Sequence, residues 1–244
     1  MKILAVIPAR YRSQRFPGKP LVLIGDRPMV QWVYDAAKQC AVFDQVVVAT
    51  DDQQIADCVK GFGGVVEMTR STHETGTDRV AEVAERYSDM EVVVNVQGDQ
   101  PFVTPTMLTE LVTPYLEGEQ PEMITLACAL TEESAYLDPN VVKVICDRHH
   151  RALYFSRASI PYYRNSGSAP VFHHLGLYAF QRSFLASYTS LTPTPLEQCE
   201  ALEQLRVLEH GYHIRVCQTQ VAVPEINTPE DLLKAQSFIA AGKA

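Results

Sequence analysis

The first hundred residues alternate between short apolar runs and longer stretches with helical spacing. The strand-like runs lie at residues 3–7, 45–49, 65–68 and 91–96. After Pro28, one face of a predicted helix is formed by Met29, Val33, Ala36 and Cys40. A second helix is predicted from Asp52 to Phe62, where two glycines supply a stop signal. This alternation indicates parallel β–α–β units in an α/β protein.

The pattern changes in the second half of the chain. Strand-like runs recur without long helices between them, at residues 123–130, 141–147, 152–156 and 175–180. They indicate a mixed rather than a purely parallel sheet. Pro195 is expected to open one helix, with an apolar stripe of Leu196, Cys199, Leu202, Leu205 and Leu208. Thr228 and Pro229 predict the start of a last helix that runs to about Ala241.

The composition is that of a soluble protein with an acidic balance. At 244 residues and 46% hydrophobic content, without a linker-like segment, the chain is expected to form a single domain over residues 1–244. The formal net charge of −8 disfavours nucleic acid as a partner. We find neither a secretory leader nor about 20 consecutive apolar residues, so we expect a cytoplasmic protein without a membrane partner.

One loop runs against this acidic balance. Four cations follow the first strand before the next acid at Asp26, and they are Arg10, Arg12, Arg15 and Lys19. Ligands of open α/β sheets bind beyond the carboxyl ends of the strands, so this cation cluster predicts an anionic ligand. The alternative is a solvated run of surface charges.

The loop matches neither glycine-rich phosphate motif. It holds a single glycine, Gly18, whereas the two motifs require G-x-G-x-x-G or G-x-x-x-x-G-K-[ST]. Phosphate binding would therefore rest on the side chains of Arg10, Ser13, Arg15 and Lys19. Several cations suit a triphosphate, in which negative charge grows on the leaving pyrophosphate, and this makes Arg10 and Lys19 catalytic candidates.

Asp99 is the candidate metal ligand. It follows the strand at residues 91–96, and Gly98 beside it permits close approach of the backbone to a nucleotide. Mg²⁺ prefers oxygen ligands and needs only one or two from the protein when phosphates supply others. The alternative is an aspartate with a turn or capping role before Pro101.

Residues 69–79 follow the third strand and are rich in short polar groups. These groups can recognise the edge of a pyrimidine, and the candidates are Arg70, His73, Gly76 and Thr77. The alternative is a capping box in which Thr75 or Thr77 starts a helix. The two interpretations are compatible.

The chain resembles a known family along nearly its whole length. The loop IPARYRSQRFPGKP resembles the signature of cytidylyltransferases that activate 3-deoxy-manno-octulosonate (Kdo) with CTP. Further matches follow in order: VATDD, MTRSTHETGTDR, VNVQGDQP, NVVKVICD, ALYFSRASIP, HLGLYAF, PLEQCEALEQLRVL and INTPEDL. The resemblance implies a nucleotide-diphospho-sugar transferase fold, with a Rossmann-like mixed sheet flanked by helices, and a homodimer. It also implies formation of a CMP-sugar and pyrophosphate for lipopolysaccharide biosynthesis.

The resemblance also assigns residues. It implies nucleotide binding at Pro8 and Ala9 as well as at the cations, and a catalytic Asp99 that holds Mg²⁺ together with position 227. For the acidic sugar it points to Gln97, Arg157, His174, Tyr178, Glu200 and Glu203. The alternative for Glu200 and Glu203 is that they are ordinary solvated acids of a helix.

The sequence departs from the family pattern mainly on the sugar side. The second metal-binding carboxylate of the family is Asn227 here, and the glutamate of its G-D-E-P motif is Gln100. Its Trp-Asp pair is replaced by Tyr162-Tyr163, and the loop at residues 164–173 is short. These changes favour either Kdo or its 8-amino analogue as acceptor. Two alternatives stay open: a cytidylyltransferase for another acid sugar such as a sialic acid, and a non-catalytic nucleotide-sugar binding protein.

Overall fold

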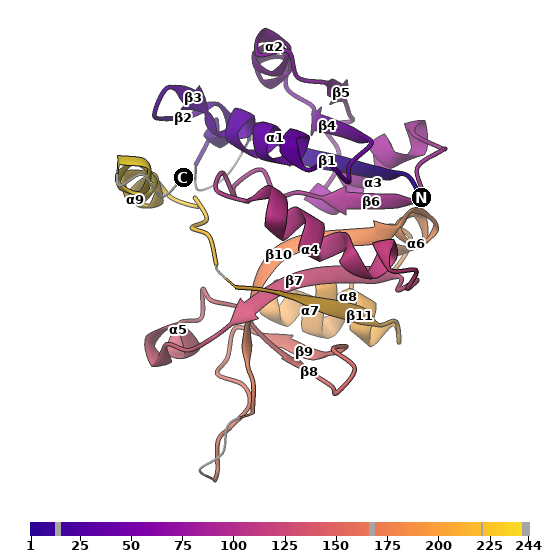
Figure 1. The fold of residues 1–244 in the computed structure, drawn as a ribbon, viewed down its shortest axis with the longest axis vertical. Helices are drawn as coiled ribbons and strands as arrows, with labels where there is room; N and C mark the ends of the chain where they lie inside the picture. Colours follow the sequence, from indigo (N-terminus) through magenta and orange to yellow (C-terminus); the bar gives the residue numbers. More distant parts are fainter. Residues whose placement is uncertain (13–15, 166–168, 221, 241–244) are drawn as a thin grey trace. The chain divides into compact units, whose positions relative to one another are not determined.

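The computed structural model describes residues 1–12, 16–165, 169–220 and 222–240 (Figure 1). The chain forms two compact units, the first from Met1–Thr109 with Val223–Ala244 and the second from Glu110–Ala222. The single domain expected from the sequence stays a prediction. Within the described residues, no helix is long and apolar enough to cross a membrane.

The first unit is built on a parallel sheet. Its strands are β1 (Ile3–Ala9), β4 (Gln45–Thr50), β5 (Val66–Met68) and β6 (Val92–Asn95). β1 pairs with β6 on one side and β4 on the other, and β4 pairs with β5, all in parallel. The sequence prediction of parallel β–α–β units is confirmed. A short antiparallel hairpin, β2 (Leu23–Ile24) and β3 (Arg27–Pro28), lies outside this sheet.

The helices of the first unit are α1 (Met29–Gln39), α2 (Gln53–Gly61), α3 (Gly76–Arg86) and α9 (Pro229–Ala240), with a 3-10 turn η1 (Lys19–Leu21). Helix α4 (Pro105–Leu116) begins in this unit and was not predicted. The helix α9 lies beside the β2–β3 hairpin (Figure 1). There Ile226 and Ala235 join Ile24, Met29 and Phe102 in one buried cluster. This cluster fixes the residues that precede α9 to the rest of the unit.

The buried face of α1 differs in part from the predicted one. Met29 and Val33 are fully buried as expected, but Ala36 is only half-buried and Ala37 takes its place. The helix ends at Gln39, and Cys40 already has an extended backbone, so the spacing of the last predicted position is no longer helical.

The second unit has the mixed sheet that the sequence predicted. Its strands are β7 (Met123–Ala129), β8 (Lys143–Cys146), β9 (Ala152–Ser156), β10 (Phe172–Gln181) and β11 (Ile214–Thr219). β7 pairs with β11 in parallel and with β10 antiparallel, while β8 pairs antiparallel with β9 and β10. The helices are α5 (Glu133–Leu137), α6 (Arg182–Tyr188), α7 (Pro195–Glu200) and α8 (Gln204–Glu209).

The single helix predicted from Pro195 is wrong. The chain breaks it at Ala201, whose φ of 52° lies in the left-handed region, and α8 starts at Gln204. The predicted stripe is right only in its second half: Leu202 and Leu205 are buried, but Leu196 and Cys199 are exposed, and Glu197 and Arg206 are buried instead. The reason is an ion pair across the break: Arg206 Nε and Nη2 donate to the two Glu197 oxygens at 2.8 and 2.6 Å.

We expect Glu197→Ala to lower the free energy of unfolding by about 3–5 kcal/mol, because it leaves the Arg206 guanidinium buried without its anion. Urea denaturation followed by circular dichroism measures the loss. The matched control is Gln198→Ala, an exposed neighbour on the same helix. Equal stabilities of the two variants would show that the pair contributes nothing.

Candidate functional site

The loop after β1 is closed by Gly18. Its φ of 69° is left-handed, and its backbone N–H donates to the carbonyl of Tyr11 at 2.8 Å. The loop then enters η1 with Lys19, whose Nζ donates to Asp99 Oδ2 and to the Ile226 carbonyl, both at 3.0 Å. At the start of the loop, Arg10 Nη1 donates to the Glu74 carbonyl at 2.7 Å. Two predicted cations therefore contact the other predicted segments, while Ser13 and Arg15 lie outside the described residues.

Three predicted segments meet at Pro8, the last but one residue of β1. A Cβ on Gly98 would lie 2.8 Å from the Pro8 carbonyl oxygen, and one on Gly76 would lie 3.5 Å from its ring. A side chain at position 98 would therefore push the loop after β6 away from β1. Gly98 thus lets the segment that carries Asp99 pack against β1 at the carboxyl ends of the strands, where Pro8, Ala9 and the start of α3 also lie, and a Cβ at Gly76 would make only an ordinary contact.

Asp99 lies in a turn, in which Gln100 N–H donates to the Gln97 carbonyl at 3.2 Å. Its side chain is 27% exposed and that of Lys19 is 16% exposed. Its backbone carbonyl accepts from Ile226 N–H at 2.9 Å, which holds the segment before α9 beside it. Asp99 therefore lies in the turn that the sequence analysis gave as an alternative role, and this turn also places its carboxylate against Lys19.

Sequence reasoning missed Glu225. Gln100 Nε2 donates to Glu225 Oε1 at 2.9 Å, and Asn227 Nδ2 donates to Glu225 Oε2 at 3.3 Å. Loss of hydration and the nearby Asp99 carboxylate raise the pKa of Glu225. Only its acidic type and its place beside Asn227 could have drawn attention to it in the sequence.

The side chains around Asp99 offer some of the oxygen ligands that a magnesium ion needs, and phosphate oxygens of the nucleotide would supply others. Within the described part of the chain, no three His, Cys, Asp or Glu side chains lie close enough to hold a metal ion by themselves. The oxygens available are those of Asp99 and its neighbours Glu225 and Asn227, and hard oxygen donors are what Mg²⁺ requires. Lys19 carries one positive charge and interacts with two carboxylates, those of Asp99 and Glu225, so these three groups together leave a net negative charge for a further cation.

In the segment predicted to contact the base, the capping box is present. Thr75 caps α3 with Asp78, each side chain bonded to the other's backbone N–H. Gly76 and Thr77 open the helix, and Thr77 is buried, accepting from Asn95 Nδ2 at 3.4 Å. The binding roles of these residues stay predictions.

Arg70 and His73 converge on one carboxylate of α3, that of Glu82. Arg70 Nε lies 3.2 Å from Glu82 Oε2, and His73 Nε2 contacts the same oxygen. Partial burial raises the pKa of Glu82, but hydrogen bonds from His73 and Arg70 outweigh it and lower the pKa from 4.5 to about 2.

A carboxyl group with a lowered folded pKa stabilises the protein above its unfolded pKa and loses this effect as the pH falls to the folded pKa. We therefore expect wild type to be more stable than Glu82→Gln at about pH 5, with the difference shrinking towards about pH 2. Urea midpoints across this range measure it, and Glu85→Gln, an exposed acid of the same helix, is the control. A difference independent of pH would contradict the assignment.

Arg79 is a second residue that the sequence reasoning did not single out. Its side chain is 1% exposed, and its Nη2 lies 3.1 Å from Asp51 Oδ1. Burial lowers the pKa of Arg79, and the positive charge of Arg10 lowers it further, whereas the attraction of Asp51 raises it. The motif residues Asp51 and Arg79 thus form an ion pair in which the guanidinium is buried and the carboxylate partly exposed, close to the Arg10 cation.

In the second unit, Arg157 and Glu200 are held together. Glu200 accepts from Ser156 Oγ at 2.6 Å and from Arg157 N–H at 2.9 Å, while Arg157 Nε donates to the Glu200 carbonyl at 2.8 Å. Glu200 is therefore not an ordinary solvated acid. Buried Lys143 donates to the Arg157 carbonyl at 2.6 Å and fixes the backbone there.

His174 and Tyr178 meet at Gln204, another residue that the sequence reasoning did not single out. Tyr178 Oη donates to Gln204 Oε1 at 3.1 Å, and Gln204 Nε2 lies 3.5 Å from His174 Nδ1. Burial, with a smaller contribution from His173, lowers the pKa of His174 to about 3, so its imidazole is neutral at pH 7. Thr125 Oγ1 donates to the Leu177 carbonyl, so it accepts from His174 Nε2 at 3.0 Å.

The remaining sugar candidates are less tightly placed. Glu203 is the N-cap residue of α8, directly before Gln204. Gln97 belongs to the first unit, where it forms the turn with Gln100. Tyr162 is 89% exposed, and Tyr163 Oη donates to the Ala169 carbonyl at 2.8 Å.

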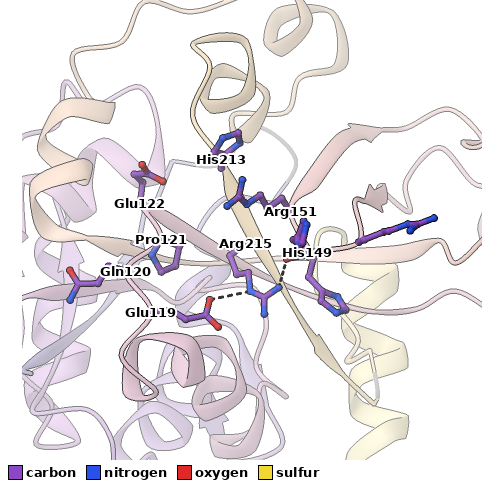
Figure 2. Close-up of a pocket in the computed structure, with 10 residues that line it drawn as sticks. Glu119, Gln120, Pro121, Glu122, His149, Arg151, His213 and Arg215 are labelled. Carbon is purple, nitrogen blue, oxygen red and sulfur yellow. Dashed lines mark hydrogen bonds and ion pairs between the residues drawn. The ribbon is translucent and has the colours of Figure 1, made fainter.

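One cavity of about 720 Å³ in the second unit contains none of the predicted site residues (Figure 2). Arg215 crosses it, donating to the His149 carbonyl at 2.6 Å and lying 3.6 Å from Glu119. Its further lining includes His150, Arg151 and His213.

A cation-bearing loop that contacts a carboxylate lies at the carboxyl ends of parallel strands, where open α/β sheets bind their ligands. Residues 4–215 match the protein family described as Cytidylyltransferase. The chain is 69% identical over 242 residues to the 3-deoxy-manno-octulosonate cytidylyltransferase of Acaryochloris marina (strain MBIC 11017), covering 99% of each chain. The chain therefore belongs to the 3-deoxy-manno-octulosonate cytidylyltransferase family.

Solved structures agree with this assignment. A CMP:2-keto-3-deoxy-manno-octonic acid synthetase complexed with CTP is similar at a TM-score of 0.95 and 40% identity, over 99% of this chain and 100% of that one. A 4-diphosphocytidyl-2C-methyl-D-erythritol synthase from Anaerococcus prevotii shares the fold at a TM-score of 0.66 and 15% identity, over 98% of each chain. The fold class predicted from the sequence is confirmed.

Proposed function

We propose that this chain activates Kdo with CTP and releases pyrophosphate, as a step of lipopolysaccharide biosynthesis. The observation that carries the proposal is the contact of Lys19 with Asp99 at the carboxyl ends of the parallel strands. The match to cytidylyltransferases along nearly the whole chain supports the same function.

In the reaction, the anomeric hydroxyl of the sugar attacks the α-phosphorus of CTP in line, and the bond to pyrophosphate breaks. Arg10 and Lys19 neutralise the phosphates, which lowers the cost of charge growing on the leaving group. Asp99 would hold Mg²⁺, with Asn227 beside it, and the ion would supply further charge neutralisation at the transferred phosphoryl group. Binding and alignment of the two substrates supply much of the remaining acceleration.

For the acceptor, we propose that the Arg157 guanidinium binds the sugar carboxylate. Glu200 and Tyr178 are proposed to meet the sugar's hydroxyl groups, and the neutral His174, bonded on both ring nitrogens inside the protein, helps to hold Gln204 and Tyr178 in place. The base is proposed to lie against Arg70, His73, Gly76 and Thr77. Homodimeric assembly and a cytoplasmic location belong to the same proposal.

Pyrophosphate release from CTP tests the function, with Kdo, its 8-amino analogue and a sialic acid as acceptors and with Mg²⁺ present or absent. We expect Mg²⁺-dependent release with an octulosonate. Release with the sialic acid alone would change the acceptor class, and no release with any acceptor would favour a binding protein.

A further inference from the structure

Glu225 is oriented by two neutral side chains. Its Oε1 accepts from Gln100 Nε2 at 2.9 Å and its Oε2 from Asn227 Nδ2 at 3.3 Å. Amide donors fix the direction of a carboxylate but leave its negative charge in place. Glu225 is thus positioned as an anion, although the residue reaches the surface of the protein.

The backbone holds this carboxylate near Asp99. Ile226, the next residue, donates its N–H to the Asp99 carbonyl at 2.9 Å and accepts from Lys19 Nζ at 3.0 Å. Its side chain is fully buried in the cluster with Met29 and Phe102. The segment from Glu225 to Asn227 is therefore fixed on both sides to the residues that surround Asp99.

The charges of this cluster do not balance. Lys19 bonds to Asp99, and Glu225 adds a second carboxylate that its amide partners do not neutralise. Both amide partners stand at positions where the resemblance implies an acid, so among these three side chains Glu225 carries the remaining carboxylate.

We propose that Glu225 is the second carboxylate of the divalent-cation site at Asp99, taking over the charge that Asn227 does not provide. The inference rests on the metal site proposed above. The affinity of an oxygen site for a divalent cation rises with the number of anionic groups around it, and partners of the ligands themselves change that affinity about 10- to 100-fold.

The test measures CTP binding by calorimetry without acceptor sugar, first in Mg²⁺ and then in EDTA. The readout is the ratio of the two affinities, which reports the metal and not turnover. We expect Glu225→Gln to lower this ratio about tenfold, since it removes the charge and keeps the shape. Affinity in EDTA should not fall.

Two further variants complete the design. Glu225→Gln combined with Asn227→Asp returns a carboxylate to position 227 and should restore the ratio to within about threefold of wild type. Glu230→Gln, an exposed acid of α9, is the matched control and should leave the ratio unchanged.

The outcomes separate the two proposals. If wild type binds CTP equally with and without Mg²⁺, the metal site at Asp99 fails. If Asp99→Asn removes the gain from Mg²⁺ but Glu225→Gln keeps it, only the inference about Glu225 is overturned. The inference is also overturned if Glu225→Gln lowers the affinity ratio and Asn227→Asp does not restore it. A carboxylate at position 227 would then be unable to replace the one at position 225.

Discussion

Asp99→Asn is expected to lower kcat/KM for CMP-sugar formation roughly 1,000-fold, because the variant removes the anion that faces Lys19 and is proposed to hold the metal. The substitution keeps the size of the side chain, and the backbone bond from Ile226 to residue 99 does not depend on it. Continuous detection of pyrophosphate measures the rate, and circular dichroism checks that the fold is retained.

Asp26→Asn is the matched control for this variant, since Asp26 is 90% exposed and lies in the hairpin turn between β2 and β3. It should retain wild-type activity. Activity of Asp99→Asn within about tenfold of wild type would remove Asp99 from the catalytic groups.

Arg157→Met is expected to raise KM for the acidic sugar about 100-fold or more while leaving KM for CTP unchanged. The guanidinium is proposed to pair with the sugar carboxylate, and loss of one member of such a pair costs at least about 2–5 kcal/mol. The split between the two KM values identifies an acceptor role, because general misfolding would impair both substrates.

Arg157 also has a structural part, since its Nη1 donates to the Pro139 carbonyl at 3.2 Å and its Nε to that of Glu200. Arg164→Met, which removes an exposed arginine of the neighbouring loop, is therefore the control. If Arg157→Met changes the urea midpoint but neither KM, the residue serves only the fold.

The parallel strands of the first unit were predictable because they are mainly apolar runs of strand length, uninterrupted in residues 3–7 and broken by Glu67 in β5. Helix α4 was missed although Leu108, Leu111, Val112 and Tyr115 are buried at helical spacing. Prolines at positions 105 and 114 concealed it. Pro105 stands at the tolerated first position of the helix, so only Pro114 breaks the rule.

The break between α7 and α8 was less accessible from the sequence. Glu197 and Arg206 are nine residues apart, a separation at which no straight helix brings two side chains together. Only the left-handed Ala201 lets them meet, and alanine carries no signal for that conformation.

The site shows the same division. Arg10, Lys19 and Asp99 could be proposed because charge type and strand ends are visible in the sequence. Glu225 could not, because its bond to Gln100 joins residues 125 positions apart. Gln204 looked like a polar residue of a helix surface, whereas the structure buries it between His174 and Tyr178.

The bond between Lys19 and Asp99 links two binding events. A phosphate that takes Lys19 leaves Asp99 without its counter-charge, and a cation that takes Asp99 leaves Lys19 free for phosphate. Once one ligand has broken the Lys19–Asp99 bond, the other no longer has to break it, so it binds more tightly. Thermodynamic reciprocity then requires that CTP tighten cation binding by the same factor by which the proposed cation tightens CTP binding. If Asp99 holds the proposed cation, cooperativity between substrate and ion follows from this one ion pair.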